Sequence, residues 1–211
     1  MQFDTDLMAA LASVEHEFGP NELAYLALTC KIELPIRDRL AFMLHRRYQG
    51  SHYLVAREWK RVDLAVLDGE AYPAYLVELK AMYTFDAAAD AGRYAKMTVA
   101  DEGKAFALAR ADTQVYSLLL ATHVHGVVPE RLFDVVKYAA GINTSVRRHQ
   151  SADHVRERAI AEVAKEHDGR ILVNHKELIA GSAFGLDVSV FCWLIRFDNA
   201  EMAALSPPLQ S

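Results

Sequence analysis

The chain has 211 residues, of which 52% are hydrophobic and 24% charged, as in a folded protein with one sizeable core. It contains no apolar run of the roughly eighteen residues that a membrane helix needs, and its first residues lack the apolar stretch of a secretion signal. Two widely separated cysteines argue against a disulfide framework or a cysteine zinc site. We therefore expect a single cytoplasmic domain over 1–211 that does not enter a membrane. The net charge of −5 is compatible with nucleic-acid binding only if basic residues gather on one face.

Apolar residues at helical spacing predict three helices within the first fifty residues. The first of them ends at Gly19 and Pro20, and Asn21 is placed to cap the second. The third begins near Pro35, which suits a first helical turn, and runs to about Tyr48. A helical layer therefore precedes the first strand.

Strand-forming residues replace this helical pattern after residue 50. The segments 53–59, 61–69 and 74–83 are rich in β-branched and aromatic residues. An Asp-Gly pair at 68–69 lies between the last two segments and predicts that they form a hairpin.

Helices and strands alternate over the remainder of the chain. The near-continuous apolar run 115–125 predicts a strand that is buried on both faces. The other expected elements are a helix capped by Asp86 that runs toward Arg110, a helix over 129–140, a helix from Ser151 to about His167, and strands over 171–181 and 186–197. This order predicts an α/β fold, with a mixed central β-sheet flanked by helices and a loose tail over 199–211.

Three charged residues are expected to meet at one end of the predicted hairpin. Glu78 and Lys80 are two positions apart on one strand, so their side chains share a face. If the hairpin folds symmetrically about its turn, Ala65 lies opposite Leu76. The same register places Asp63 opposite Glu78, with the two Cβ atoms about 5 Å apart.

Two carboxylates that face each other in this way repel unless positive charge lies between them. Lys80 supplies part of that charge, and a divalent cation can supply the rest, since Mg²⁺ binds through one or two carboxylates, water and phosphate oxygens. Such a cation activates water and stabilises charge on a phosphodiester, while a neighbouring lysine positions the water or neutralises the transition state. We therefore expect Asp63 and Glu78 to bind Mg²⁺ or Mn²⁺ and Lys80 to assist the attacking water.

An acidic residue two positions before a lysine is by itself a weak pattern, and it occurs in this chain at Glu58, Glu78 and Glu102. The pattern at Glu102 and Lys104 falls on a predicted helix, where residues two apart do not face each other. Only the pattern at Glu78 has an aspartate on the preceding hairpin strand.

The arrangement resembles the PD-(D/E)xK, or restriction-endonuclease-like, nuclease superfamily. The likeness covers about residues 33–125, with Asp63 on one strand, Glu78-x-Lys80 on the next, and then a helix and the buried strand. Val62 precedes Asp63 where the family motif has proline. The resemblance implies a restriction-endonuclease-like fold with an αβββαβ core, and a metal-dependent phosphodiesterase that usually acts on DNA.

The resemblance also implies that helices contribute to the site. A glutamate from the helix before the strands often joins it, and Glu33 is a better candidate than Glu22 because its helix leads directly into the strands. The alternative is that Glu33 is only a favourable negative charge at a helix N-terminus. Arg93, Tyr94 and Lys96, on the helix after the motif, either contact a phosphate or form a solvated helix face.

Other stretches leave alternatives open. Arg147 and Arg148 belong to a locally basic stretch that either contacts a nucleic-acid backbone or is solvated. His123 and His125 share a strand face, as structural histidines or as ligands of a histidine-based metal hydrolase. A further alternative is an inactive nuclease fold that binds nucleic acid or protein. If the chain cuts both DNA strands, we expect a homodimer.

Overall fold

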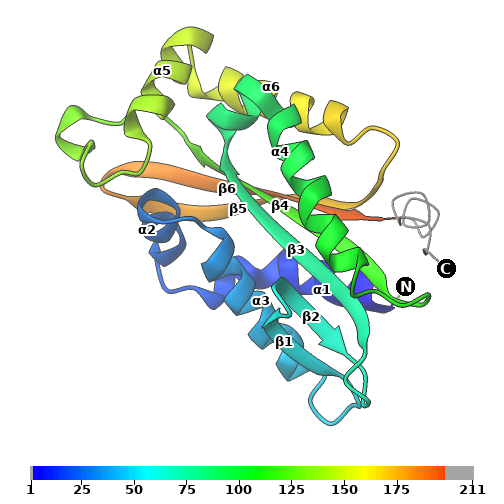
Figure 1. Ribbon diagram of the computed structural model, residues 1–211. Helices are drawn as coiled ribbons and strands as arrows, with labels where there is room; N and C mark the ends of the chain where they lie inside the picture. Colours follow the sequence, from blue (N-terminus) through cyan, green and yellow to red (C-terminus); the bar gives the residue numbers. More distant parts are fainter. Residues whose placement is uncertain (1, 198–211) are drawn as a thin grey trace.

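A six-stranded mixed sheet forms the centre of the structure, and the computed structural model describes residues 2–197 (Figure 1). Its strands lie in the order β1-β2-β3-β4-β6-β5. Their bounds are Leu54–Trp59 for β1, Val62–Leu67 for β2, Pro73–Tyr83 for β3, Gln114–Val124 for β4, Ile171–Ala183 for β5 and Leu186–Arg196 for β6. The β3–β4 pair is parallel, and the other neighbouring pairs are antiparallel.

Helices cover both faces of this sheet (Figure 1). Helices α1, α2 and α3 pack on one face, α4 and α6 pack on the other, and α5 contacts α4 and α6. Their bounds are Gln2–Ser13 for α1, Glu22–Thr29 for α2, Glu33–Arg47 for α3, Thr84–Phe106 for α4, Ala139–His149 for α5 and Ala152–Glu166 for α6, with short 3₁₀ helices at Val14–Glu17 and Glu130–Leu132.

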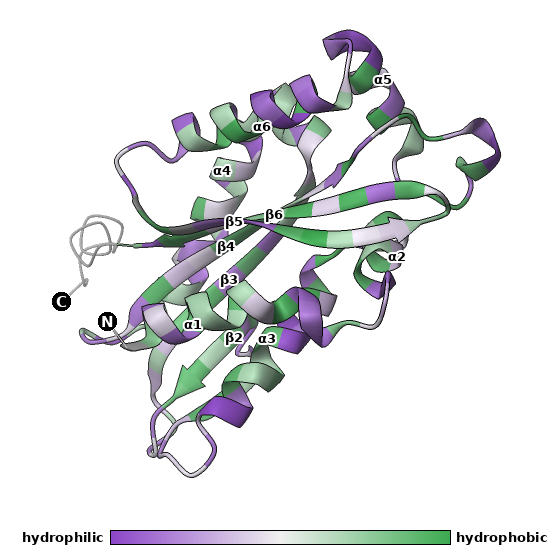
Figure 2. Ribbon diagram, turned by 180° about the vertical axis from the view of Figure 1, so that it is seen from behind, coloured by the Kyte–Doolittle hydropathy of each residue, from purple (hydrophilic) through white to green (hydrophobic). Residues whose placement is uncertain are grey.

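The hydrophobic core is divided by the sheet into two layers. Val77 and Leu118 point toward α1–α3, whereas their chain neighbours Leu76 and Leu119 point toward α4 and α6. This division follows from the two-residue period of a strand. Figure 2 shows hydrophobic residues along the central strands and hydrophilic ones on the outer sides of the helices. The predicted mixed sheet flanked by helices is confirmed, as is the burial of β4 on both faces.

Two of the three predicted capping side chains do not cap as expected. Asn21 stands at the predicted N-cap position of α2, but it has a left-handed φ of 61° and its side chain accepts from the Ser182 N–H of β5 instead of bonding to the helix. Asp86 is the third residue of α4 and accepts from the N–H of Tyr83, which is the true cap. The predicted cap at Ser151 is confirmed, because its hydroxyl accepts a backbone N–H of α6.

The helix predicted over 129–140 is also wrong. Only Glu130–Leu132 forms a 3₁₀ turn there, and α5 begins at Ala139. Just before this segment, the Asn143 side chain binds both the N–H and the carbonyl of Val128, at 2.7 Å each. Within it, the Lys137 N–H donates to the Leu28 carbonyl of α2 at 2.7 Å and Tyr138 has a φ of 59°, so a tertiary hydrogen bond and a left-handed residue override the local helical pattern.

The predicted loose tail over 199–211 lies outside the described residues. None of the helices in the described part of the chain combines the length and apolar character that crossing a bilayer requires.

Candidate active site

The β2–β3 hairpin brings Asp63 and Glu78 together. The backbone pairs Ala65 with Leu76 as predicted, but the hairpin is not symmetric about its turn, because a bulge between Val66 and Leu67 pairs Leu67 with Pro73. Continued by one residue beyond the Leu64–Val77 pair, the register places Asp63 opposite Glu78, and the N–H of Leu79 donates a 2.8 Å hydrogen bond to Asp63 Oδ2. The aspartate is therefore held against β3 by the backbone.

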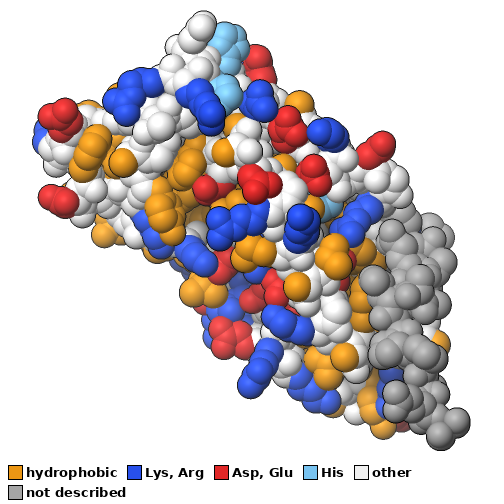
Figure 3. All heavy atoms as spheres, turned by 45° about the horizontal axis from the view of Figure 1, so that its top comes forward, with side chains coloured by type: hydrophobic (Ala, Val, Ile, Leu, Met, Phe, Trp, Pro, Cys, Tyr) orange, Lys and Arg blue, Asp and Glu red, His pale blue; other side chains and the backbone are white. Residues whose placement is uncertain are grey.

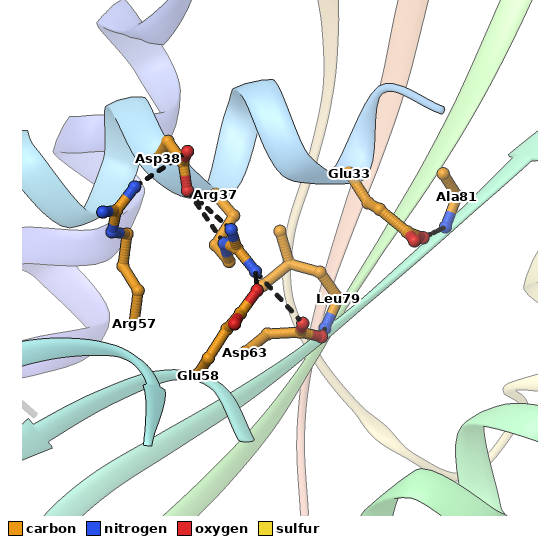
Figure 4. A network of polar contacts seen from close by, with 8 residues as sticks. All are labelled: Glu33, Arg37, Asp38, Arg57, Glu58, Asp63, Leu79 and Ala81. Atoms are coloured by element: carbon orange, nitrogen blue, oxygen red, sulfur yellow. Dashed lines mark hydrogen bonds and ion pairs between the residues drawn. The ribbon is translucent and has the colours of Figure 1, made fainter. Parts of the chain in front are cut away.

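A second carboxylate follows the same edge of β3 (Figure 4). Strand β2 begins at Val62, whereas β3 continues beyond the residues that pair with β2. Backbone N–H groups along this unpaired edge of β3 therefore donate to side chains: the Leu79 N–H donates to Asp63, and the Ala81 N–H donates to Glu33 Oε2 at 3.0 Å. Backbone N–H groups two residues apart on a strand are about 7 Å apart. The two carboxylates thus lie in series along the edge.

Glu33 lies in the first turn of α3, where a negative charge is favourable. Its bond to Ala81 is a second role, which connects α3 to the strand that bears Glu78 and Lys80. Glu22 contacts the Gly19 N–H at 2.7 Å. The expected preference for Glu33 over Glu22 at this edge therefore agrees with the geometry.

Glu78 is buried beside Asp63, with 6% of its surface exposed. Burial raises the pKa of Glu78. The negative charge of Asp63, a hydrogen bond between these two side chains and the negative charge of Asp101 raise it further, to about 8, although Lys104 acts in the opposite direction. Its Oε1 atom is buried and has no hydrogen-bond partner among the described residues. An unpaired buried carboxylate oxygen is costly, so this atom is suited to receive a cation or a proton.

Lys80 points to the same side of the sheet, but its ion-pair partner comes from α4. Its Nζ lies 2.5 Å from Asp101 Oδ2, and Lys104 Nζ lies 2.6 Å from Asp101 Oδ1. Burial alone acts to raise the pKa of Asp101, but the hydrogen bonds from Lys104 and Lys80 outweigh it and hold that pKa below its usual value. The cluster is therefore two carboxylates, two lysines and the aspartate that joins the lysines.

Sequence reasoning missed Asp101 and Lys104. The acidic-x-Lys pattern considered there used Glu102, whose side chain is buried and pairs with Arg170 at 3.2 Å. The relevant pair, Asp101 and Lys104, is three residues apart, which is the spacing of neighbours on a helix surface. The three-residue spacing can be recognised in the sequence, but the packing of this part of α4 against Lys80 of β3 cannot.

Arg37, also missed by sequence reasoning, is a buried cation behind Asp63 (Figure 4). Its Nη1 lies 2.7 Å from Glu58 Oε1 and 3.9 Å from Asp63 Oδ1, and its guanidinium also binds Asp38 at 2.9 Å. Glu58 lies near the end of β1, beside the tight β1–β2 turn, and Glu58, Lys60 and Arg61 all have positive φ. The arginine thus links α3, this strained turn and the first carboxylate of the site.

Replacement of Arg37 by alanine is expected to lower the free energy of unfolding by about 2 kcal/mol, because three acidic side chains lose their shared cation. Urea denaturation measures the change. Arg39→Ala is the matched control, since the Arg39 side chain is 42% exposed and pairs with Glu22. Equal unfolding midpoints for the two variants would contradict this role.

Arg93 and Tyr94 line a cavity of about 360 Å³ together with Lys80. Both residues project from α4, and the hydroxyl of Tyr94 bonds to Asp86. Lys96 is exposed on the same helix and does not line the cavity. Two of the three residues proposed from α4, Arg93 and Tyr94, therefore line the cavity.

Arg147 and Arg148 lie in the last turn of α5 and are exposed. Arg147 contacts the hydroxyl of Thr144 at 3.4 Å. Figure 3 shows basic and acidic side chains interspersed over the face that it presents. That face does not display a segregated basic patch.

His123 lies in β4 and His125 directly follows the end of that strand, with ring centroids 4.6 Å apart. His123 Nδ1 bonds to the Thr84 hydroxyl at 2.9 Å, and His125 Nε2 bonds to the Ser189 hydroxyl at 2.8 Å. Burial lowers the pKa of His123 to about 3, and His125 lowers it further. These contacts fix His123 within the packing between β4 and α4, whereas His125 is exposed and is tied to β6 through Ser189.

The described residues do not contain a group of three or more His, Cys, Asp or Glu side chains arranged to hold a metal ion. Asp63 and Glu78 are a pair of carboxylates, and Mg²⁺ is usually bound by one or two protein carboxylates when water and phosphate oxygens complete its coordination shell. The structure thus defines a mixed α/β protein with an acidic pair and two lysines at the end of a hairpin. Comparison with protein-family models, curated proteins and solved structures found no match.

Proposed function

We propose that this chain is a metal-dependent nuclease of the restriction-endonuclease-like, PD-(D/E)xK class, and that it hydrolyses phosphodiester bonds in DNA. The observation that carries the proposal is the buried, unpartnered Oε1 of Glu78 beside the carboxylate of Asp63. Two ionised carboxylates in this position repel each other unless a cation lies between them.

The order of elements supports the proposal. Helix α3 is followed by β1, β2 and β3 as an antiparallel meander, then by α4 and by β4 parallel to β3. This is the αβββαβ order that the resemblance implies.

The side chains at the site also fit a divalent cation. Mg²⁺ or Mn²⁺ would be held by Asp63 and Glu78, through hard oxygen ligands, one of which is the unpartnered Oε1. When bound, the ion polarises the phosphodiester and lowers the pKa of water. The raised pKa of Glu78 predicts that its proton is released as the ion binds.

The other residues act around that pair. Lys80 and Lys104 place positive charge next to the carboxylates, where they neutralise the charge that develops on phosphate oxygens, and Lys80 can also orient the attacking water. Asp101 holds both ammonium groups in position. Glu33 and Arg37 position the site by fixing β3 and Asp63.

Purified protein is expected to cleave plasmid, linear duplex or single-stranded circular DNA with Mg²⁺ or Mn²⁺ and not with EDTA. Lys80→Ala should lower the rate about a hundredfold, since removal of one group that stabilises the transition state costs this much. Lys165→Ala, at an exposed lysine on α6, is the matched control and should cleave normally. Gel electrophoresis of the products measures both rates.

Absence of cleavage on all three substrates, from folded protein that also does not bind Mn²⁺, would overturn the nuclease proposal. The inactive nucleic-acid-binding or protein-interaction module would then replace it. The engagement of Lys80 and Lys104 by Asp101 favours that alternative, because a lysine held by an aspartate is less available to substrate.

A further inference from the structure

The cavity that begins at Lys80 has the composition of a site for an anionic aromatic ligand. Its volume of about 360 Å³ falls within the usual range for small-ligand sites, about 300–1,000 Å³. Loops, β3 and α4 contribute its walls, which include Lys31, Lys80, Asp86, Arg93, Tyr94 and Tyr138. Because Lys80 belongs both to this Lys80 cavity and to the carboxylate cluster, a ligand in the cavity lies next to that cluster.

Positive charge predominates in the Lys80 cavity, although the whole chain has a net charge of −5. Lys31, Lys80 and Arg93 line it, and Asp86 is the acidic residue among its walls. The Asp86 carboxylate accepts from the Tyr83 N–H at 3.2 Å and from the Tyr94 hydroxyl. The acid is thus used to orient Tyr94. Lys80 is engaged by Asp101, so Lys31 and Arg93 are the cationic side chains that can face an anion such as a phosphate.

Tyr138 adds an exposed aromatic surface to the cavity. The residue has φ of 59°, a left-handed conformation that costs a non-glycine residue about 1 kcal/mol. The adjacent N–H of Lys137 donates to the Leu28 carbonyl at 2.7 Å and so fixes this turn to α2. Tyr138 packs edge-on against Tyr83 at 5.4 Å, yet 51% of its surface is exposed. A strained backbone thus holds a half-exposed ring at a charged cavity.

We propose that the Lys80 cavity binds an unpaired nucleotide of the substrate, with its base on Tyr138 and Tyr94 and its phosphates on Lys31 and Arg93. A base within a duplex is paired and stacked and cannot enter a cavity of this size, whereas an unpaired base presents a free face for stacking. The preferred substrate is therefore single-stranded DNA or the unpaired end of a duplex. This inference rests on the proposed nuclease function for its choice of ligand.

Binding of a fluorescent oligo(dT) strand, measured by anisotropy in EDTA so that it stays intact, tests the proposal. Tyr138→Ala is expected to weaken binding about tenfold, because stacking of one base on an aromatic ring is lost. Tyr25→Ala is the matched control, since Tyr25 is 52% exposed on α2 and lies outside the cavity. A blunt hairpin duplex should bind more weakly than the single strand and respond little to either variant.

Equal affinity of the two variants for the single strand would overturn the proposal, as would duplex binding as tight as single-strand binding by the unmodified protein. The assay does not depend on catalysis, so its failure can be distinguished from failure of the nuclease proposal. If the protein cleaves DNA but Tyr138→Ala does not weaken binding of the single strand, only the proposed role of the cavity is rejected. If Tyr138→Ala weakens binding of the single strand but the protein cleaves no DNA, only the nuclease proposal is rejected.

Discussion

Replacement of Asp63 by asparagine is expected to abolish metal-dependent cleavage and at the same time to stabilise the metal-free protein. The variant loses one of the two carboxylates proposed to hold the cation, so the cleavage rate should fall about a thousandfold or more. The amide oxygen can still accept from the Leu79 N–H, and the amide nitrogen can donate to the neighbouring carboxylate of Glu78. The variant also loses the 3.9 Å ion pair with Arg37, a long contact that contributes less than the repulsion costs, so the free energy of unfolding should rise by about 1 kcal/mol.

The two effects are measured by plasmid cleavage and by denaturation in EDTA. Denaturation should be done at about pH 9, above the pKa of Glu78, where both carboxylates are ionised in the unmodified protein. Asp153→Asn serves as control, because Asp153 is exposed and pairs with Arg156 on α6. Loss of both stability and activity in Asp63→Asn would instead indicate a structural aspartate.

The stability of the metal-free protein is expected to fall as pH rises from about 4.5 to about 8 because of Glu78. Its pKa increases from 4.5 in the unfolded reference to about 8 in the folded protein, so the folded state binds the proton more tightly. The stabilisation from this proton is complete below the lower value and is lost by the upper one. Burial of Glu78 makes the expected loss on the order of a few kcal/mol.

Mg²⁺ should reverse this loss selectively at high pH. A cation binds the ionised pair, so it should raise the melting temperature near pH 9 and have little effect near pH 5. Glu78→Gln removes the titrating group and should show a weaker dependence of melting temperature on both pH and Mg²⁺. Identical pH profiles for Glu78→Gln and the unmodified protein would contradict the assignment of the titration to this residue.

The opposition of Asp63 and Glu78 could be predicted from sequence because a hairpin is a local structure. Its strands are joined by a short turn, and the two-residue period determines which side chains share a face. The placement of Lys80 on the same face as Glu78 follows from the same two-residue period. What the period does not contain is the partner of Lys80, because Asp101 approaches from a helix that begins after the hairpin has ended.

Segments whose conformation depends on distant partners were predicted less well. Asn21 has the residue type of a helix cap, but it is held by Ser182 of β5. The segment 129–140 has helical spacing, but the Lys137 N–H donates to the Leu28 carbonyl and Tyr138 has a positive φ, and neither fits a continuous helix. In each case a hydrogen bond between residues remote in the sequence outweighed a local preference.

The sequence by itself therefore determined the α/β architecture, the hairpin and the acidic pair with its lysine, since these depend on residue periodicity within neighbouring segments. The tertiary structure alone decided how those charges are compensated. It brought Asp101 and Lys104 from α4, Arg37 from α3 and Tyr138 from the turn before α5 to this end of the sheet. Contacts between elements that are far apart in the chain have no repeat in the sequence, so packing of the helices on the sheet was needed to reveal them.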